Sequence, residues 1–501
     1  MSKMTTVCMS ALMCFGLSTL SVNAANSIST YQTVKSSLST DNACRDFNLQ
    51  EMNLKSILFN AGNNADETQE TNLTNVYAKD YPFSGGKGTK ANPYQIATPE
   101  DLVMLSENVG LKVSYEGEYF KMTQDIDMQN VSDFTPIGNN FGENGNDLKA
   151  FRGVFDGDGH TISNLHIAMK GKNHIGVGLF GITLNAVVKG ITFVDCSFTA
   201  DAIVAAVVGV SMGGEIIDCH VGRNVEVKAT KQPYAGGIVA ASMDQGTKVD
   251  RCSNQAPVAA MMGAGGIMGT NAAFGTKISR CINYGDIEAT MDIAGGILGY
   301  SEMTVTVSDC GNVGAVAATQ KVAAGIVGAL SPQVPGPLTI YNTYNNGLIS
   351  SGEEDYHMPI TVMAMAMQQV GVTNSYYNSS LFTTQASYGT PLTPEEMQNG
   401  TLEACLNGNH GDIWVSGEGE GSTPTPFGGD TSIEDVPAVE TPQVTVADGC
   451  VVAPEGYSVV RLFDVQGKSY VNAALPAGVY VAVVCADGEL LKPMSVKVVV
   501  E

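Results

Sequence analysis

A short glycine-rich motif recurs along this chain at nearly constant spacing. Successive copies lie 28, 31, 29, 30 and 29 residues apart, at Gly178–Gly181, Ala206–Gly209, Gly237–Ala240, Gly266–Gly269, Gly296–Gly299 and Gly325–Gly328. A fixed period of this size indicates that each unit is one supersecondary element stacked on the next. The sequence therefore predicts a solenoid, which limits the fold more than any other feature does.

Each repeat is typical of strands rather than helices. The unit from Met261 to Ala289 contains the short runs GGIMG, TKIS and DIEA, separated by small and polar residues, and no 3.6-residue apolar pattern spans them. We interpret the three runs as strands of one coil of a parallel β-helix, with GGIMG as its buried strand. Equivalent residues of successive coils should then stack about 4.8 Å apart.

Stacking predicts columns of identical side chains. Cysteines share one position, at Cys219, Cys252, Cys281 and Cys310, which Thr343 continues. Asparagines share another, at Asn254, Asn283, Asn312 and Asn345, and Gly285, Gly314 and Gly347 follow the last three as expected turn residues. Stacked asparagines can hydrogen-bond from coil to coil. Since Ile278 and Cys281 are three residues apart, both can face the core only if a corner lies between them.

We take these positions as structural repeat residues: Gly237, Gly266, Gly269, Gly296, Gly299, Gly325, Gly328, Cys252, Cys281, Cys310, Asn254, Asn283, Asn312 and Asn345. The cysteine column leaves three interpretations open. The thiols can be small buried side chains, they can form disulfides between adjacent coils, or they can belong to a metal or redox site. No C-x-x-C pair occurs in the chain, so a thiolate zinc site has little support.

The regions around the repeats differ in composition. Residues 1–24 have the pattern of a signal peptide, with Lys3 before an apolar run and a small-residue cleavage site, and residues 25–80 are polar. Residues 81–175 are expected to form an N-terminal cap and the first coils, with a helix at 98–109 that begins with Thr98 as N-cap. The β-helix covers 176–415, a linker 416–443, and a small antiparallel β-sandwich 444–501.

Composition excludes some functions. Asp and Glu outnumber Lys and Arg by 50 to 26, a formal charge of −24, and no basic cluster interrupts the excess. Such a chain repels phosphate backbones, so nucleic acid is not an expected partner. Beyond the predicted signal peptide, no apolar stretch reaches the roughly 18 residues that a membrane helix needs.

The repeated units resemble the GLUG motif of bacterial surface and adhesin-like proteins. The upstream elements Asn92–Tyr94, Asp125–Asp127, Pro136–Gly138 and Phe155–Ile162 are similar to the segment that precedes such repeats, including those beside the protease domain of immunoglobulin A-cleaving metallopeptidases. The resemblance covers about residues 81–415 and implies a right-handed parallel β-helix. It implies no activity, and the zinc motif of those peptidases is absent from this chain.

The tail is similar to C-terminal modules of secreted Bacteroidetes proteins. Phe463–Lys468, Leu475–Tyr480 and Lys497–Val500 carry the resemblance. It implies a sorting domain for type IX secretion, with anchoring at the outer membrane or cell surface. The closing Glu501 departs from the basic residue that such tails often end on, so an immunoglobulin-like module remains as the alternative.

Two carboxylate-rich stretches are candidates for chemistry. Asp156 and Asp158 can bind calcium, with His160 as an acid or base, or can belong to a tight turn between strands. Asp125 and Asp127 can act as an acid pair or lie on a solvated face. The tyrosines that could form a sugar-stacking surface share no repeat position: Tyr234, Tyr284, Tyr300, Tyr341, Tyr344, Tyr376 and Tyr377.

Two hypotheses for function follow. The first is a non-enzymatic, secreted or cell-surface β-helix protein that binds a host surface protein or glycan. No nucleophile elbow, zinc-binding helix or phosphate loop occurs, so we expect no catalytic residue, cofactor or metal. The second is a polysaccharide lyase or glycosidase on the same scaffold, with a charged column as the candidate site, at Asp218, Arg251, Arg280 and Asp309. A mixed-charge ladder that stabilises the stack explains the column equally well.

Overall fold

The structure is a computed structural model of the 501-residue chain. It describes residues 83–138, 140–141, 148–169, 175–222, 224–231, 233–331, 338–352, 357–361, 370–382, 388–408, 412–417, 422–427, 444–447, 450–454, 457–464, 469–470, 475–486 and 494–500. The predicted signal peptide and the polar segment 25–80 lie outside this range. No helix among the described residues is long and apolar enough to cross a membrane.

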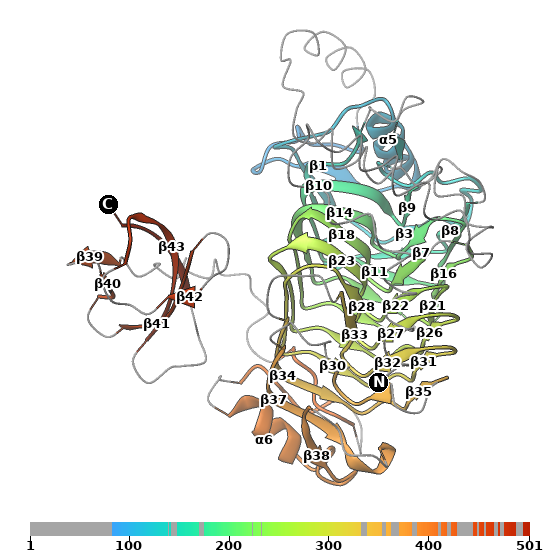
Figure 1. Ribbon diagram of the computed structural model, residues 1–501. Helices are drawn as coiled ribbons and strands as arrows, with labels where there is room; N and C mark the ends of the chain where they lie inside the picture. Colours follow the sequence, from blue (N-terminus) through green and yellow to red (C-terminus); the bar gives the residue numbers. More distant parts are fainter. Residues whose placement is uncertain are drawn as a thin grey trace, which may run out of the picture. The chain divides into compact units, whose positions relative to one another are not determined.

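The repeats form a parallel β-solenoid, as the period predicts (Figure 1). Two of its sheets contain seven parallel strands each. The first stacks β8 (His166–Met169), β12 (Ser197–Ala200), β16 (Glu226–Ala229), β21 (Val258–Ala260), β26 (Ile287–Ala289), β31 (Val316–Ala318) and β35 (Ile349–Ser351). The second stacks β9 (Gly176–Val177), β13 (Ile203–Val204), β17 (Tyr234–Gly236), β22 (Gly263–Gly265), β27 (Ile293–Gly295), β32 (Val322–Ala324) and β36 (His357–Met358).

A third, branched sheet covers the remaining side. Its first strands are the short β1 (Tyr94–Ile96), β2 (Tyr119–Met122) and β6 (Val154–Asp156), followed by the ten-residue strands β10 (Phe180–Lys189) and β14 (Val208–Ile217). In each of the next three coils, two shorter strands take the place of one such long strand. They are β18 (Val239–Gln245) and β19 (Thr247–Asp250), β23 (Met268–Phe274) and β24 (Thr276–Ser279), and β28 (Leu298–Ser301) and β29 (Val305–Ser308). The last coils contribute β33 (Val327–Leu330), β34 (Leu338–Asn345), β37 (Val370–Asn378) and β38 (Thr390–Leu392).

A narrow stack of short strands joins this sheet around a corner. It contains β3 (Ile126–Asp127), β7 (Thr161–Ser163), β11 (Thr192–Val194), β15 (His220–Val221), β20 (Ser253–Asn254), β25 (Ile282–Asn283) and β30 (Gly311–Asn312). In-register pairing of Asn254, Asn283, Asn312 and Asn345 confirms the predicted asparagine column. The same register places the cysteines, and then Thr343, directly above one another.

The corner predicted between Ile278 and Cys281 is confirmed. Arg280 has a left-handed backbone, with φ of 49°, and so do its equivalents in the other coils: Asp218, Arg251, Asp309, Asn342 and Asn374. This conformation is uncommon for residues other than glycine, because the Cβ atom crowds the following carbonyl oxygen. It reverses the side-chain parity, so that Ile278 and Cys281 both point into the core.

The prediction that GGIMG forms one buried strand is wrong. Strand β22 ends at Gly265 and β23 begins at Met268, so Gly266 and Ile267 form another corner. Periodicity could not show this, because a corner made by glycine and a strand made by glycine share the same apolar, small composition. Every copy of the motif for which flanking strands are described breaks in the same way.

The interior is one continuous apolar cluster, whose side chains become smaller along the axis of the solenoid. Large rings fill the first coils, among them Phe120, Phe151, Phe155, Phe180, Phe193 and Phe198. Later coils are filled by Ala, Val, Ile and Cys, such as Ala264 and Cys281, which are fully buried.

Helices close the two ends of the stack (Figure 1). Helix α5 (Pro99–Gly110) has Thr98 as its N-cap and Pro99 as its first residue, which confirms the prediction, and Thr98 and Asp101 form a full capping box. Its buried Leu102 and Leu105 belong to the main core. At the other end, α6 (Thr401–Asn407) packs in a second cluster with Tyr344, Trp414 and Leu392 of β38, while Leu381 of the 3₁₀ turn η4 (Ser379–Leu381) packs against the main core.

This C-terminal cap continues into residues assigned from sequence to the linker 416–443. Val415 and Thr425 exchange backbone hydrogen bonds of 3.0 and 2.8 Å. The Tyr344 hydroxyl bonds to Thr423 Oγ1 at 3.0 Å and donates to the Pro424 carbonyl at 2.9 Å. The described residues 422–427 therefore pack on the solenoid.

The C-terminal region is antiparallel. It contains a four-stranded sheet of β41 (Tyr457–Asp464), β42 (Ser469–Tyr470), β43 (Gly478–Ala486) and β44 (Met494–Val500), and a separate hairpin of β39 (Thr445–Ala447) and β40 (Cys450–Val452). A further hairpin, β4 (Asn140–Phe141) and β5 (Leu148–Lys149), projects from the first coils.

Candidate functional site

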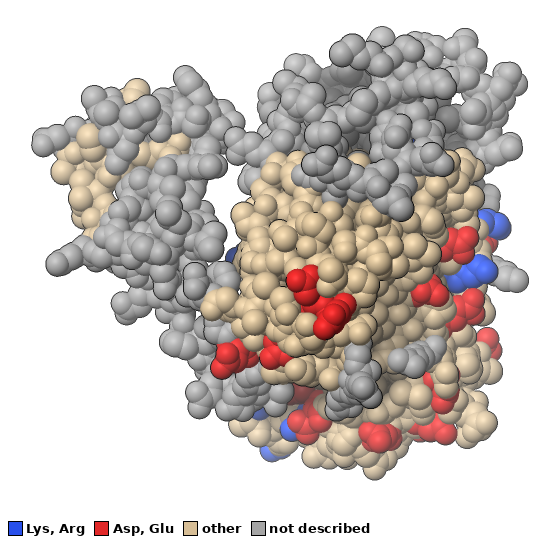
Figure 2. Space-filling model, turned by 90° about the horizontal axis from the view of Figure 1, so that it is seen from below, with Lys and Arg blue, Asp and Glu red and all other residues tan. Residues whose placement is uncertain are grey.

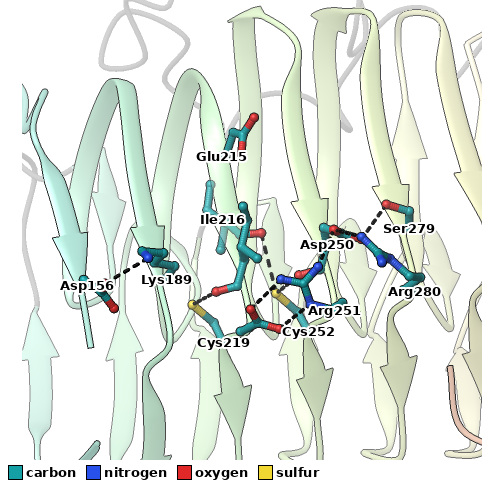
Figure 3. Close-up of polar contacts among 12 residues, drawn as sticks. Asp156, Lys189, Glu215, Ile216, Cys219, Asp250, Arg251, Cys252, Ser279 and Arg280 are labelled. Atoms are coloured by element: carbon teal, nitrogen blue, oxygen red, sulfur yellow. Dashed lines mark hydrogen bonds and ion pairs between the residues drawn. The ribbon is translucent and has the colours of Figure 1, made fainter. Parts of the chain in front are cut away.

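The charged column lies along the left-handed corner. Figure 3 shows its arginines, Arg251 and Arg280, with the neighbouring Asp250. The guanidinium of Arg251 donates two hydrogen bonds of 2.6 Å to the carboxylate of Asp218 in the preceding coil, from Nε to Oδ1 and from Nη2 to Oδ2. This fork geometry is the strongest form of a charge-assisted hydrogen bond. The carboxylate of Asp218 raises the pKa of Arg251 further, so the guanidinium stays charged.

Arg280 makes the equivalent contact one coil later, but to the neighbouring carboxylate of Asp250. Arg280 Nε lies 2.9 Å from Asp250 Oδ1, and its Nη2 contacts Oδ2. Ser279 Oγ donates to Oδ1 at 2.8 Å, and Arg251 Nη1 lies 3.3 Å from Oδ2. The side chain of Asp250 is only 1% exposed, so these donors replace the water that its charge would otherwise need.

Further along, uncharged groups continue the same column. Asn342 Nδ2 donates to Asp309 Oδ1, and Asn374 Nδ2 donates to Asn342 Oδ1 at 2.6 Å. The left-handed corner thus brings the sequence-predicted residues Asp218, Arg251, Arg280 and Asp309 into one line. Within it Arg251 pairs with Asp218, whereas Arg280 pairs with Asp250 and Asp309 accepts from Asn342. This arrangement favours the structural interpretation of the column over the enzymatic one.

The asparagine ladder is complete over four coils. Each Nδ2 donates to the Oδ1 of the next coil, at 2.9 Å from Asn254 to Asn283, 2.8 Å from Asn283 to Asn312 and 2.8 Å from Asn312 to Asn345. The same Nδ2 atoms also donate to a backbone carbonyl two residues ahead, Gly285 for Asn283. All four side chains are buried, so the ladder satisfies the polar groups of each turn without water.

The motif glycines pack directly against these asparagines. A Cβ on Gly237 would lie 2.6 Å from Asn254 Cγ, and Gly266, Gly296 and Gly325 face Asn283, Asn312 and Asn345 in the same way. The second motif glycines, Gly269, Gly299 and Gly328, would instead meet backbone carbonyls of neighbouring coils. The glycine and asparagine columns are therefore two halves of one packing arrangement.

A second buried polar ladder was missed from the sequence. It runs through Ser211, Thr247, Ser242, Thr276, Asn271 and Ser301, with oxygen–oxygen and nitrogen–oxygen distances of 2.6 to 3.2 Å. Ser211, Ser242, Asn271 and Ser301 stand in register in successive coils. Their separation by one repeat period was the available signal, but the change from Ser to Asn and back hid the column.

The cysteine column consists of free, buried thiols. Cys219, Cys252, Cys281 and Cys310 are 0% exposed and carry no disulfide. Each thiol donates to the carbonyl two residues before it, at 3.1 Å for Cys281 and 3.0 Å for Cys310. Burial raises the pKa of Cys219 and Cys281, which disfavours the reactive thiolate. The interpretation as small apolar core residues therefore fits best.

The turn at residues 156–160 uses its carboxylates in ion pairs. Asp156 Oδ2 lies 2.9 Å from Lys189 Nζ, and Asp158 Oδ2 lies 2.9 Å from Lys121 Nζ. Asp158 and Gly159 have positive φ, as a tight turn between β6 and β7 requires. His160 Nδ1 lies 3.1 Å from Asp125 Oδ1. No cluster of three or more His, Cys, Asp or Glu suited to a metal occurs among the described residues.

The tyrosines are less scattered than the sequence suggested. Tyr344 and Tyr376 stand in register in adjacent coils, which corrects the expectation that no tyrosine position repeats. Tyr344 is fully buried against Trp414, with ring centroids 5.5 Å apart, so the rings of Tyr344 and Trp414 do not face solvent as a sugar platform, while Tyr376 is partly exposed. Tyr284, one residue beyond the asparagine ladder, remains partly exposed.

Tyr284 lines a hollow of about 390 Å³ on the outside of the asparagine corner. The other lining residues are Gln255, Pro257, Gly285, Asp286 and Val313. Gln255, Tyr284 and Val313 each follow a ladder asparagine, so they form one outward column. Pro257 and Asp286 lie two residues after Gln255 and Tyr284 and form a second column. The backbone at Gly285 lies between the two columns. We call this hollow the Tyr284 groove.

The surface matches the acidic composition. Figure 2 shows Asp and Glu side chains scattered over one end of the molecule, while the few Lys and Arg side chains in view lie near its edges. No basic patch appears on the described part of this face.

Comparisons with known proteins find only partial likenesses, and no family model matches the chain. It is 34% identical over 152 residues to "Halomucin" of Haloquadratum walsbyi, a match that covers 28% of this chain and 2% of that protein. It is 33% identical over 135 residues to a "Putative Gly-rich membrane protein" of Evansella cellulosilytica, covering 26% and 15% of the two chains. The chain thus spans a small part of either relative.

One solved structure has a related outline. The crystal structure of "a putative immunoglobulin A1 protease" from Bacteroides ovatus aligns with a TM-score of 0.46 at 19% sequence identity. The alignment covers 68% of this chain and 94% of the other. The fold class of this chain, an all-β parallel solenoid, comes from its own strand pairing.

Proposed function

We propose that this chain is a non-enzymatic, secreted or cell-surface protein that uses its β-solenoid to bind a surface protein or glycan of a host. The observation that carries the proposal is the pairing of both arginines of the charged column with carboxylates of the protein itself. Arg251 and Arg280 direct their guanidinium groups at Asp218 and Asp250, so these groups stabilise the stack instead of facing a substrate.

The finer parts of the proposal come from the sequence. The signal-peptide pattern of residues 1–24 supports export, and the GLUG-like repeats support a right-handed coil and display at a cell surface. The C-terminal strands are compatible with an immunoglobulin-like module or a type IX sorting domain, which would anchor the chain. The matches to parts of a halomucin and of a protein named as a membrane protein are compatible with a surface role.

The alternative, a polysaccharide lyase or glycosidase, needs charged groups that are free to act on a sugar ring. Such enzymes place two carboxyl groups, or a carboxyl and a basic group, on either side of the scissile bond. In the predicted column each guanidinium already has a carboxylate partner. The pairing therefore supports a binding protein over an enzyme.

The test is binding by the whole chain to an array of host glycans and to immobilised host matrix proteins, with heat-unfolded protein as the control. We expect the folded chain to bind at least one ligand and the unfolded chain to lose that binding. Absence of binding by the folded chain to every glycan and matrix protein would overturn the proposal.

A further inference from the structure

The Tyr284 groove has the size and chemistry of a small ligand site. Its volume of about 390 Å³ lies within the range of known ligand pockets. It presents apolar surface from Pro257 and Val313, an aromatic ring from Tyr284, and polar groups from Gln255 and Asp286. A mixture of one aromatic face with a few polar groups is suited to a ligand that has both apolar faces and hydroxyl groups.

The polar groups of the groove have unused hydrogen-bonding capacity. Within the part of the chain that the structure describes, the Tyr284 hydroxyl and the Gln255 carboxamide make no side-chain hydrogen bond. Asp286 uses only Oδ1, which accepts from the Ala315 amide at 3.0 Å, and this leaves Oδ2 open. Partial burial raises the pKa of Tyr284, so its hydroxyl stays protonated and can both donate and accept.

The backbone of Gly285, between the two columns, is in contrast already hydrogen-bonded at both its amide and its carbonyl. The Gly285 amide donates to the Asn254 carbonyl, and the Gly285 carbonyl accepts from Asn283 Nδ2 at 2.8 Å. An extended peptide binds most often by pairing its own amides with an open backbone edge. Because the amide and the carbonyl of Gly285 already have partners, the groove favours a ligand that side chains recognise.

The charge of the chain narrows the ligand further. With a formal charge of −24, and with Asp286 in the groove itself, the site repels uronates and sulfated sugars. A carboxylate and a carboxamide can instead accept and donate hydrogen bonds to neutral hydroxyl groups.

We propose that the Tyr284 groove binds a neutral hexose-based glycan, with the Tyr284 ring against one sugar face and Gln255 and Asp286 bonded to its hydroxyl groups. This inference rests on the proposed binding function and names the site and the ligand class. The groove follows the outward columns of successive coils, so it suits a polymer lying along the solenoid.

The test is calorimetric titration of the full chain with soluble glucan, mannan and galactan, and with polygalacturonate as the anionic probe. We expect at least one neutral polymer to bind and polygalacturonate not to bind. Tyr284→Ala should weaken binding at least tenfold. Asp286→Asn, which keeps an acceptor for the Ala315 amide, should weaken it several-fold.

Matched variants separate the groove from general effects on folding. Tyr284→Phe keeps the packed ring and removes only the hydroxyl, so it should fold normally and lose a smaller part of the affinity. Glu288→Gln removes an exposed carboxylate from the same strand as Ile287 and Ala289, outside the groove, and should bind like the unchanged chain. Gln255→Ala removes the carboxamide of the groove and should weaken binding several-fold, whereas Gln320→Ala removes an exposed carboxamide outside the groove and should leave binding unchanged.

The outcomes distinguish the two proposals. If a glycan or matrix protein binds and every groove variant binds equally well, the groove inference is wrong while the binding function stands. Preference for polygalacturonate, or failure of all three neutral polymers to bind, would also overturn the groove inference. If the folded chain binds nothing on the arrays either, both proposals fail.

Discussion

Asn254 Cγ lies 2.6 Å from the point where a Cβ atom on residue 237 would stand, and the carbonyl oxygen of Gly266 lies 2.2 Å from it, so these two neighbours together require a glycine at 237. The same pair recurs in the following coils, as Gly266 with Asn283, Gly296 with Asn312 and Gly325 with Asn345. The repeated glycine and asparagine positions thus reflect one contact between two columns of residues, which are separated in the sequence and adjacent in space.

A substitution of Gly266 by alanine should destabilise the protein by about 2 to 4 kcal/mol, because the added methyl group overlaps the Asn283 carboxamide and the Gly296 backbone. Chemical denaturation followed by circular dichroism measures this loss. Gly110→Ala is the control, since a Cβ there meets nothing within 4 Å. Equal stabilities of the two variants would contradict the packing account.

The asparagine ladder should behave as a cooperative unit. Asn283→Ala removes the partner of Asn312 Oδ1 and of the Gly285 carbonyl in a buried site, and should cost about 2 to 4 kcal/mol. The double variant Asn283→Ala, Asn312→Ala should cost at least about 1 kcal/mol less than the sum of the single variants. Asn283→Ala combined with the distant, exposed Glu100→Ala should be additive. Additivity in both pairs would argue against a ladder.

The charged column should contribute to folding. Arg280→Ala leaves the buried Asp250 carboxylate with fewer donors, and we expect a loss of about 1 to 3 kcal/mol in the free energy of unfolding. Lys248→Ala breaks an exposed pair with Glu215 at 3.7 Å, and should change stability by about 0 to 1 kcal/mol. An Arg280→Ala protein as stable as the unchanged chain would remove the argument for a structural column.

Partial burial of Glu302 gives a prediction for pH. Desolvation raises the pKa of this carboxyl from 4.5 to about 7. Between these values the folded chain keeps a proton that the unfolded chain has lost, so stability should fall as pH rises through this window. Glu302→Gln should remove that part of the pH dependence and be more stable than the unchanged chain at pH 8, by about 1 to 3 kcal/mol. Parallel stability curves for the two proteins would contradict the assignment.

The sequence predicted the features that repeat without change. The period indicated a parallel solenoid, and the identical Cys and Asn residues placed two columns in their observed register. The corner inside GGIMG was not predicted, because a turn and a strand that are both rich in glycine have the same composition. The second buried polar ladder, from Ser211 to Ser301, was not predicted because its residues change between Ser, Thr and Asn from coil to coil.

Contacts outside the repeat could not be predicted from its period. Tyr344 bonds to Thr423, 79 residues further along, and this contact organises the C-terminal cap around Trp414. The Tyr284 groove is equally invisible in sequence, because its walls come from three coils and its residues differ in type. The charged column was identified correctly as a line of residues, but only the direction of its side chains indicated a structural role.

The most direct test of the central claim, that the solenoid binds without cleaving, is the chain length of a polysaccharide recovered from its complex with the protein. The account predicts that the polymer is recovered at its original length, with no new reducing ends or unsaturated products after prolonged incubation. Shortening of the polymer by the unchanged chain, abolished in a folded Arg280→Ala variant, would contradict it and make the charged column catalytic.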